Sequence, residues 1–191
     1  MSASDAAEQG FWVFGYGSLM WKPGFEFVER RLARLDGYRR RFALSSTRYR
    51  GSPEEPGLLL GLDWAPGQSC LGAAFRISPA MADETRAYLA ERELVTRSYF
   101  EISTPVTLIC DGPGQGARFD AICYVLDRTH PQYAGDLALE DQIHRIRSAA
   151  GPMGLCREYF DNTVAHLAEL GIEEPEIAAL AEALKSTPPQ D

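Results

Sequence analysis

The sequence predicts an α+β protein in which mostly antiparallel strands are joined by helices that come late in the chain. Six short runs have a strand-like composition, and loops rich in glycine and proline separate them. The runs lie at 11–15, 41–47, 58–63, 70–77, 99–109 and 119–126, and the loops at 51–57, 65–69 and 111–116. Strands and helices do not alternate regularly, which argues against a doubly wound parallel sheet.

The first and the last of these runs are expected to be buried. Phe11-Trp12-Val13-Phe14 is apolar without interruption, as in a strand that is covered on both faces. Residues 119–126 carry apolar side chains at odd and even positions alike. This last strand is therefore expected to be central in the sheet.

Four segments have helical signals. Ser78-Pro79 pairs an N-cap residue with a proline at the first helical position, and predicts a helix that runs to about Leu94. Apolar residues recur at helical spacing in three later segments, which are 137–150, 157–170 and 174–185. The stripes of the first two segments are Leu139, Ile143 and Ile146, and Phe160, Val164 and Leu167.

The 191 residues are expected to form a single domain over 11–185, with loose tails at 1–10 and 186–191. The hydrophobic content of 45% and the charged content of 24% are ordinary for a globular protein. The net charge of −8 argues against a general nucleic-acid binder, because phosphate contact needs clustered lysine and arginine. The short basic cluster from Arg30 to Arg41 is interpreted as solvated residues at a sheet edge.

The sequence predicts a cytoplasmic protein without membrane, metal or nucleic-acid partners. No run approaches the roughly 20 apolar residues of a membrane helix, and residues 1–10 resemble neither a signal nor a transit peptide. The cysteines and histidines lack metal-ligand spacing, and the thiols are expected to stay reduced. They are Cys70, Cys110, Cys123 and Cys156, and His130, His144 and His166. The oligomeric state is left open, with a monomer as one option.

A glycine-rich turn, Gly15-Tyr16-Gly17-Ser18-Leu19, follows the first strand. Glycines let the backbone turn sharply and let N–H groups approach a ligand with no Cβ in the way. Successive N–H groups of this kind form an anion-binding nest. The residues alone leave open an anion-binding loop or a tight turn between strands, and the short pattern by itself favours the turn.

Four segments resemble the ChaC family of γ-glutamylcyclotransferases in order and in rough spacing. They are Phe14-Gly15-Tyr16-Gly17-Ser18-Leu19-Met20-Trp21, Tyr49-Arg50-Gly51-Ser52-Pro53, Tyr88-Leu89-Ala90-Glu91-Arg92-Glu93, and Gly151-Pro152-Met153-Gly154 with Glu158-Tyr159. Together they span about residues 11 to 170. The resemblance implies a small mixed β-barrel packed by helices, the γ-glutamylcyclotransferase-like fold. The strand pattern alone does not select a barrel.

Glu93 is the candidate catalytic residue. It shares a helical stripe with Leu89 and lies near a helix C-terminus, where the dipole disfavours negative charge. Burial and the dipole would both raise its pKa, which suits a general base near neutral pH. The residues alone favour a surface glutamate paired with Arg92 or Arg97, whereas the resemblance implies catalysis.

The resemblance implies a glutathione-specific γ-glutamylcyclotransferase, a lyase that releases 5-oxoproline and cysteinylglycine. In this reaction the substrate's α-amino group attacks its own γ-carbonyl, so the substrate supplies the nucleophile and no metal or organic cofactor is expected. Glu93 would move the proton. Backbone N–H groups of Tyr16, Gly17, Ser18 and Leu19 would hold the α-carboxylate or the oxyanion.

Arg50 and Tyr159 are the further substrate-binding candidates. Arg50 lies in a loop rich in glycine and proline, and it is suited to pair with a substrate carboxylate. Tyr159 follows the late Gly-Pro loop and is suited to donate a hydrogen bond. The alternatives are an exposed loop arginine and a core aromatic residue. Two departures from the family, Leu155-Cys156-Arg157 and Leu94-Val95-Thr96, bear on substrate detail.

Two other functions stay open at this point. One is a cyclotransferase for other γ-glutamyl amines or peptides, and the other is a non-catalytic small-molecule binder of the same fold. Glu93 argues against the binder, since such a module has no need of a carboxylate there. A thiol hydrolase built from Cys156 and a histidine has no supporting motif.

Overall fold

A computed structural model describes residues 10–109 and 114–186. Contacts divide the chain into two compact units, which are described separately: the first holds residues up to Arg39 and Leu62–Asp127, and the second Arg40–Gly61 and the residues from Arg128 onward. Apart from Gly10 and Ser186, the tails expected at 1–10 and 186–191 lie outside the described residues, as do Cys110 and 111–113. The single domain over 11–185 stays a prediction.

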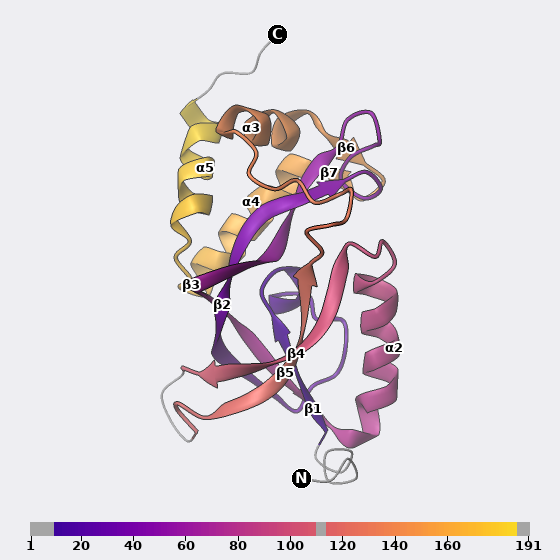
Figure 1. Cartoon of the computed structure of the whole chain (residues 1–191), viewed down its shortest axis with the longest axis vertical. Helices are drawn as coiled ribbons and strands as arrows, with labels where there is room; N and C mark the ends of the chain where they lie inside the picture. Colours follow the sequence, from indigo (N-terminus) through magenta and orange to yellow (C-terminus); the bar gives the residue numbers. More distant parts are fainter. Residues whose placement is uncertain (1–9, 110–113, 187–191) are drawn as a thin grey trace. The chain divides into compact units, whose positions relative to one another are not determined.

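The strands form a closed barrel, which confirms the α+β class and the barrel that the family resemblance implied (Figure 1). The strands are β1 (Phe11–Gly15), β2 (Glu29–Ser46), β3 (Gly57–Ile77), β4 (Tyr99–Leu108) and β5 (Arg118–Leu126). Their order around the barrel is β1-β3-β2-β4-β5. β1 and β5 pair in parallel, whereas β1 with β3, β2 with β4, and β4 with β5 pair antiparallel. Pairing on both sides makes β5 a central strand, as predicted.

The structure corrects two strand boundaries. β2 begins at Glu29 rather than at 41, because its polar first half still alternates: Ala33 and Leu35 are buried, whereas Arg34 and Asp36 are exposed. β3 runs through the loop expected at 65–69, an exposed stretch in which Gly67 has a left-handed φ of +82°. Pro66 and Gly67 therefore mark a local irregularity within a strand and not its end.

The basic cluster is also partly corrected. Arg34 is exposed and pairs with Asp36, as expected for a solvated residue. Arg40, however, is fully buried and forms an ion pair with Glu174 of the same unit. A buried guanidinium needs a charged partner, and that partner is distant in sequence, so local charge patterning does not predict it.

In the first unit, one helix lies along the outside of the barrel (Figure 1). A short 3-10 turn, η2 (Pro79–Met81), leads into α2 (Ala82–Glu93), as the Ser78-Pro79 signal predicted. The Arg86 guanidinium of α2 lies 4.3 Å from the centre of the Phe11 ring on β1. The helix is thereby fixed beside the strand that leads into the glycine-rich turn.

In the second unit, three helices pack against one another: α3 (Leu139–Ser148), α4 (Cys156–Glu169) and α5 (Pro175–Ser186). A small hairpin of β6 (Ala150–Gly151) and β7 (Gly154–Leu155) joins α3 to α4. The predicted stripes are buried at Ile143, Ile146, Phe160 and Leu167, whereas Val164 is half-buried and Leu139 is 45% exposed. None of the helices in the described part of the chain is long and apolar enough to span a membrane.

Candidate active site

The glycine-rich turn lies in the first unit, directly after β1. Residues 18–20 form a 3-10 turn, η1 (Ser18–Met20), closed by the Met20 N–H, which donates to the Gly17 carbonyl at 2.8 Å. The opening N–H groups of such a turn have no partner within it. Gly17 itself has φ −130°, so the turn does not need a left-handed glycine there. The tight position is Gly15, where an added Cβ would lie 3.0 Å from the Cβ of Leu19.

Glu93 is the last residue of α2, in the same unit. Thr85 and Leu89 on its stripe are buried, and the Glu93 side chain is 16% exposed, whereas Glu91 is exposed. Burial raises the pKa of Glu93 above its ordinary value of 4.5, and the neighbouring Arg92 cation opposes that rise. The alternative of a solvated surface glutamate is therefore wrong about the exposure of Glu93, whereas its choice of Arg92 as the partner is right.

Arg92 connects Glu93 to the glycine-rich turn. Its Nε lies 3.1 Å from Glu93 Oε1, and its Nη2 donates to Ser18 Oγ at 2.9 Å. Its Nη1 donates to the carbonyls of Lys22 and Pro23, at 2.8 and 3.1 Å. Two of the four family-like segments are thereby joined through one guanidinium.

Sequence reasoning did not assign this role to Arg92. Residues adjacent in a helix do not normally face each other, so spacing rules give no reason to pair Arg92 with Glu93. The available signal was the adjacency of arginine and glutamate at the helix end in the family-like segment.

A buried tyrosine is electrostatically coupled to Glu93. Tyr124 of β5 donates its hydroxyl to Glu101 of β4 at 2.8 Å. Burial raises the pKa of Tyr124, and the carboxylates of Glu101 and Glu93 raise it further. The phenol is therefore neutral at physiological pH and remains a hydrogen-bond donor.

Arg50 and Tyr159 come together in the second unit. Arg50 Nη1 donates to the Leu155 carbonyl at 3.1 Å and lies 3.5 Å from Glu158 Oε2. The guanidinium carbon is 6.0 Å from the centre of the Tyr159 ring. The Arg50 side chain is only 19% exposed, so the alternative of a freely solvated loop arginine is wrong.

Glycines explain why the loop that carries Arg50 meets the hairpin that precedes Tyr159 on α4. The Met153 N–H donates to the Tyr49 carbonyl at 2.9 Å, and a Cβ on Gly151 would lie 2.4 Å from that carbonyl oxygen. Gly154 has φ +101°, and its added Cβ would lie 2.8 Å from Arg50 Nη1. A side chain at Gly151 would push the hairpin away from the Arg50 loop, and one at Gly154 would strain the left-handed backbone and displace the Arg50 guanidinium.

The departure at residues 155–157 has a structural consequence. Leu155 is exposed, whereas Cys156 is buried and its thiol donates to the Leu58 carbonyl at 3.3 Å. Burial raises the pKa of the Cys156 thiol, so it is protonated near neutral pH and is a poor nucleophile. Cys70 and Cys123, in the other unit, are likewise buried free thiols.

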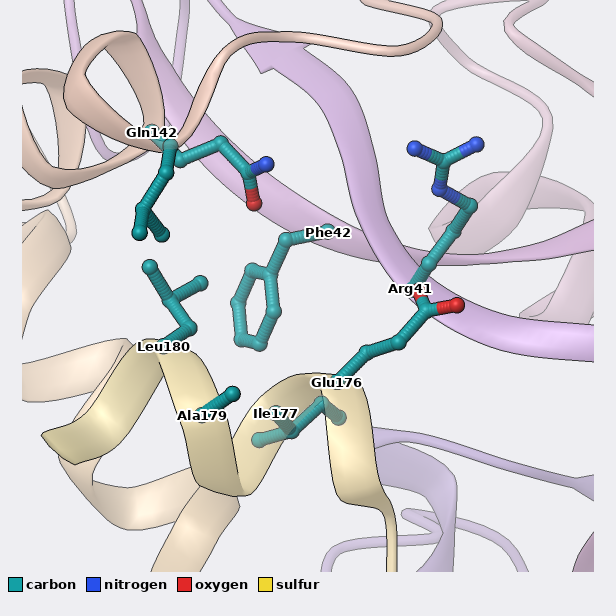
Figure 2. Close-up of a pocket in the computed structure, with 8 residues that line it drawn as sticks. Arg41, Phe42, Gln142, Glu176, Ile177, Ala179 and Leu180 are labelled. Atoms are coloured by element: carbon teal, nitrogen blue, oxygen red, sulfur yellow. The ribbon is translucent and has the colours of Figure 1, made fainter. Parts of the chain in front are cut away.

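A pocket of about 290 Å³ in the second unit contains none of the predicted site residues. It is lined by Arg41, Phe42, Leu139, Gln142, Glu176, Ile177, Ala179 and Leu180. In Figure 2 the Phe42 ring points toward Ile177 and Ala179 of α5, whereas the Arg41 guanidinium points away from that ring. The exposed Leu139 forms part of this lining, which accounts for a stripe residue that does not enter the core.

Comparison with known proteins extends over nearly all of the chain. The sequence model of the ChaC-like protein family matches residues 11–187. A glutathione-specific gamma-glutamylcyclotransferase of Escherichia coli (strain K12) is 32% identical over 163 residues, which are 85% of this chain and 68% of the relative. Gamma-glutamylcyclotransferase 2-3 of Arabidopsis thaliana is 33% identical over 173 residues, or 89% of this chain and 86% of the relative.

A solved structure agrees with these relatives. The crystal structure of a yeast gamma-glutamyl cyclotransferase specific to glutathione superposes with a TM-score of 0.79 at 25% identity. The match covers 93% of this chain and 96% of the yeast chain. The barrel with its helices is thus the γ-glutamylcyclotransferase fold.

Proposed function

This chain belongs to the ChaC-like family, and we propose that it is a γ-glutamylcyclotransferase that degrades glutathione to 5-oxoproline and cysteinylglycine. The observation that carries the proposal is Glu93, a largely buried carboxylate whose pKa is raised by burial. A carboxylate of this kind is suited to accept a proton near neutral pH. A module that only binds a ligand gains nothing from the cost of burying it.

The reaction balances without any further reactant. The α-amino nitrogen of the γ-glutamyl unit attacks the γ-carbonyl carbon, a ring C–N bond forms, and the amide C–N bond to cysteine breaks. One proton leaves the attacking nitrogen and one reaches the departing nitrogen. Glu93 accepts the first proton and delivers it to the cysteinylglycine amine, so it ends the cycle as a carboxylate.

The other candidate residues bind and orient the substrate in this proposal. Backbone N–H groups from Tyr16 to Leu19 hold the α-carboxylate or the oxyanion, and the opening of η1 supplies donors that the turn itself does not use. Arg50 pairs with a substrate carboxylate and Tyr159 donates a hydrogen bond; their mutual contact supports a shared role. The buried thiols fit an enzyme of the reducing cytoplasm.

The direct test is to incubate the purified protein with glutathione and to quantify the products by mass spectrometry. Equimolar 5-oxoproline and cysteinylglycine are expected. Other γ-glutamyl dipeptides, assayed in parallel, test whether the enzyme accepts a broader range of substrates. The exposed Leu155, at a departure from the family sequence, is the observation that motivates this assay. Binding of glutathione without any 5-oxoproline would identify a non-catalytic binder instead.

Activity is expected to survive both chelation and loss of the Cys156 thiol. The substrate supplies the nucleophile, so treatment with EDTA should leave the rate unchanged. Cys156→Ser keeps a donor toward Leu58 and should retain most of the activity, with a lower melting temperature because a buried sulfur is replaced by a smaller polar atom. Complete loss of the rate of a folded protein in either test would indicate a metal or thiol mechanism.

Gly17→Val is expected to fold and to lose about 10²-fold in kcat/KM, the effect typical of a lost oxyanion donor. The loss is expected because valine adds a branched side chain in a loop that approaches the substrate. Initial rates and thermal melting on one preparation check this. A destabilised protein with full specific activity would mean that the loop is only a structural turn.

A further inference from the structure

Arg92 has contacts that the proposed chemistry does not use. Its guanidinium reaches Glu93 on its own helix, Ser18 on η1, and the carbonyls of Lys22 and Pro23 just after η1. We propose that Arg92 is a positioning residue, which fixes the general base and the glycine-rich turn in one arrangement and holds Glu93 beside a permanent cation. This inference rests on the proposed function, because it assigns how that same site is assembled.

The geometry requires arginine rather than another cation. A guanidinium is planar and presents five N–H donors, so it can contact a carboxylate, a hydroxyl and backbone carbonyls in one plane at the same time. Tyr88, one turn earlier in α2, contributes a further contact, with its hydroxyl 2.8 Å from Arg92 Nη1. A lysine ammonium in this place retains the charge but cannot span acceptors that lie on both sides of the guanidinium.

Partial burial strengthens the electrostatic interaction between Arg92 and Glu93. The Arg92 side chain is 21% exposed and the Glu93 side chain is 16% exposed. An ion pair in such surroundings is screened by water much less than a surface pair. The contacts also join residues 18–23 to residues 88–93, so that a movement of the turn is transmitted to the base.

The charges around Glu93 define what Arg92 does electrostatically. Glu93 interacts electrostatically with Arg92 on its own helix and with the Tyr124 phenol on β5. The Tyr124 hydroxyl donates to Glu101 of β4, and the Arg86 cation of α2 lowers the pKa of Tyr124. Tyr124 is neutral, so it does not replace a cation. Burial raises the pKa of Glu93 and Arg92 opposes that rise, and removal of the cation therefore leaves burial unopposed.

The test compares Arg92→Met with Arg92→Lys through the pH dependence of kcat/KM for glutathione. Because the base must be ionised, the rate falls on the acidic side as Glu93 takes up a proton. In Arg92→Met the acidic limb is expected to move to higher pH by about one pH unit or more, the usual effect of an adjacent opposite charge. In Arg92→Lys the limb should stay near its original position while kcat falls about 10²-fold, because the base and the turn are no longer aligned.

Arg34→Met is the matched control. It removes one cation from the same unit, from an exposed pair with Asp36, and should leave both the limb and kcat unchanged. A structural role alone would lower the stability of both Arg92 variants without moving the limb.

A second measurement does not depend on turnover. The side-chain carboxyl of Glu93, observed by ¹³C NMR and assigned with Glu93→Gln, should titrate at higher pH in Arg92→Met than in the original protein. Equal titration midpoints, or equal acidic limbs, would overturn the proposal for Arg92. Absence of 5-oxoproline from the original protein would instead refute the proposed function and leave the NMR comparison intact.

Discussion

Glu93→Gln is expected to reduce kcat for glutathione by about 10²–10⁴-fold, the usual contribution of a general base. The amide keeps the shape of the side chain, and its oxygen can still accept from Arg92 Nε. What it loses is the ability to take the proton from the substrate's amino group. Quantification of 5-oxoproline under saturating glutathione gives the rate directly.

The same substitution should not destabilise the protein at neutral pH. Burial raises the pKa of Glu93 in the folded state, so the folded state binds this proton more tightly than the unfolded chain does. The resulting stabilisation is complete below the unfolded pKa and is lost as pH rises through the folded pKa. The difference in melting temperature, Glu93→Gln minus the original protein, should therefore be larger at pH 8 than at pH 4. Thermal melts of both proteins at both pH values measure it.

Glu91→Gln is the control, because Glu91 lies two residues away on the same helix and is exposed. Its rate and melting temperature should stay close to those of the original protein. Near-original turnover of Glu93→Gln would remove Glu93 from the chemistry, and equal losses in both variants would indicate a general effect of charge on this helix.

Elements whose determinants are local could be predicted from the sequence. Uninterrupted apolar residues gave β1 its position, strand-like composition gave β4 and β5, and Ser78-Pro79 marked the start of η2 and α2. The first half of β2 was missed because strong positive charge outweighed the alternation of Ala33 and Leu35. Closure into a barrel depends on pairings between distant strands, and only the family resemblance indicated it.

The site was predicted to the extent that single residues carry it. The helical stripe located Glu93 on a buried face, and the turn residues located the glycine-rich loop. Arg92 contacts Ser18, Lys22 and Pro23, which lie 74, 70 and 69 residues earlier in the sequence. No local pattern encodes such contacts, so they became visible only in the folded chain.

Arg50→Met is expected to raise KM for glutathione by about 10–100-fold with little change in kcat, in line with the loss of one charged hydrogen bond. Methionine retains the apolar stem that packs near Tyr159 and removes the guanidinium. Arg157→Met is the matched control: Arg157 lies on α4 and pairs with Asp161 at 2.8 Å on the exposed surface, so its loss should leave KM unchanged.

A modified substrate identifies which carboxylate Arg50 holds. If Arg50 pairs with the C-terminal carboxylate, glutathione amidated at its glycine should bind the original protein as weakly as glutathione binds Arg50→Met, and the amide should be indifferent to the substitution. If Arg50 pairs with the α-carboxylate, the substitution should cost the amide and glutathione the same factor. An unchanged KM in Arg50→Met would leave the guanidinium with a structural role alone, holding Leu155 and Glu158 where Gly154 admits them.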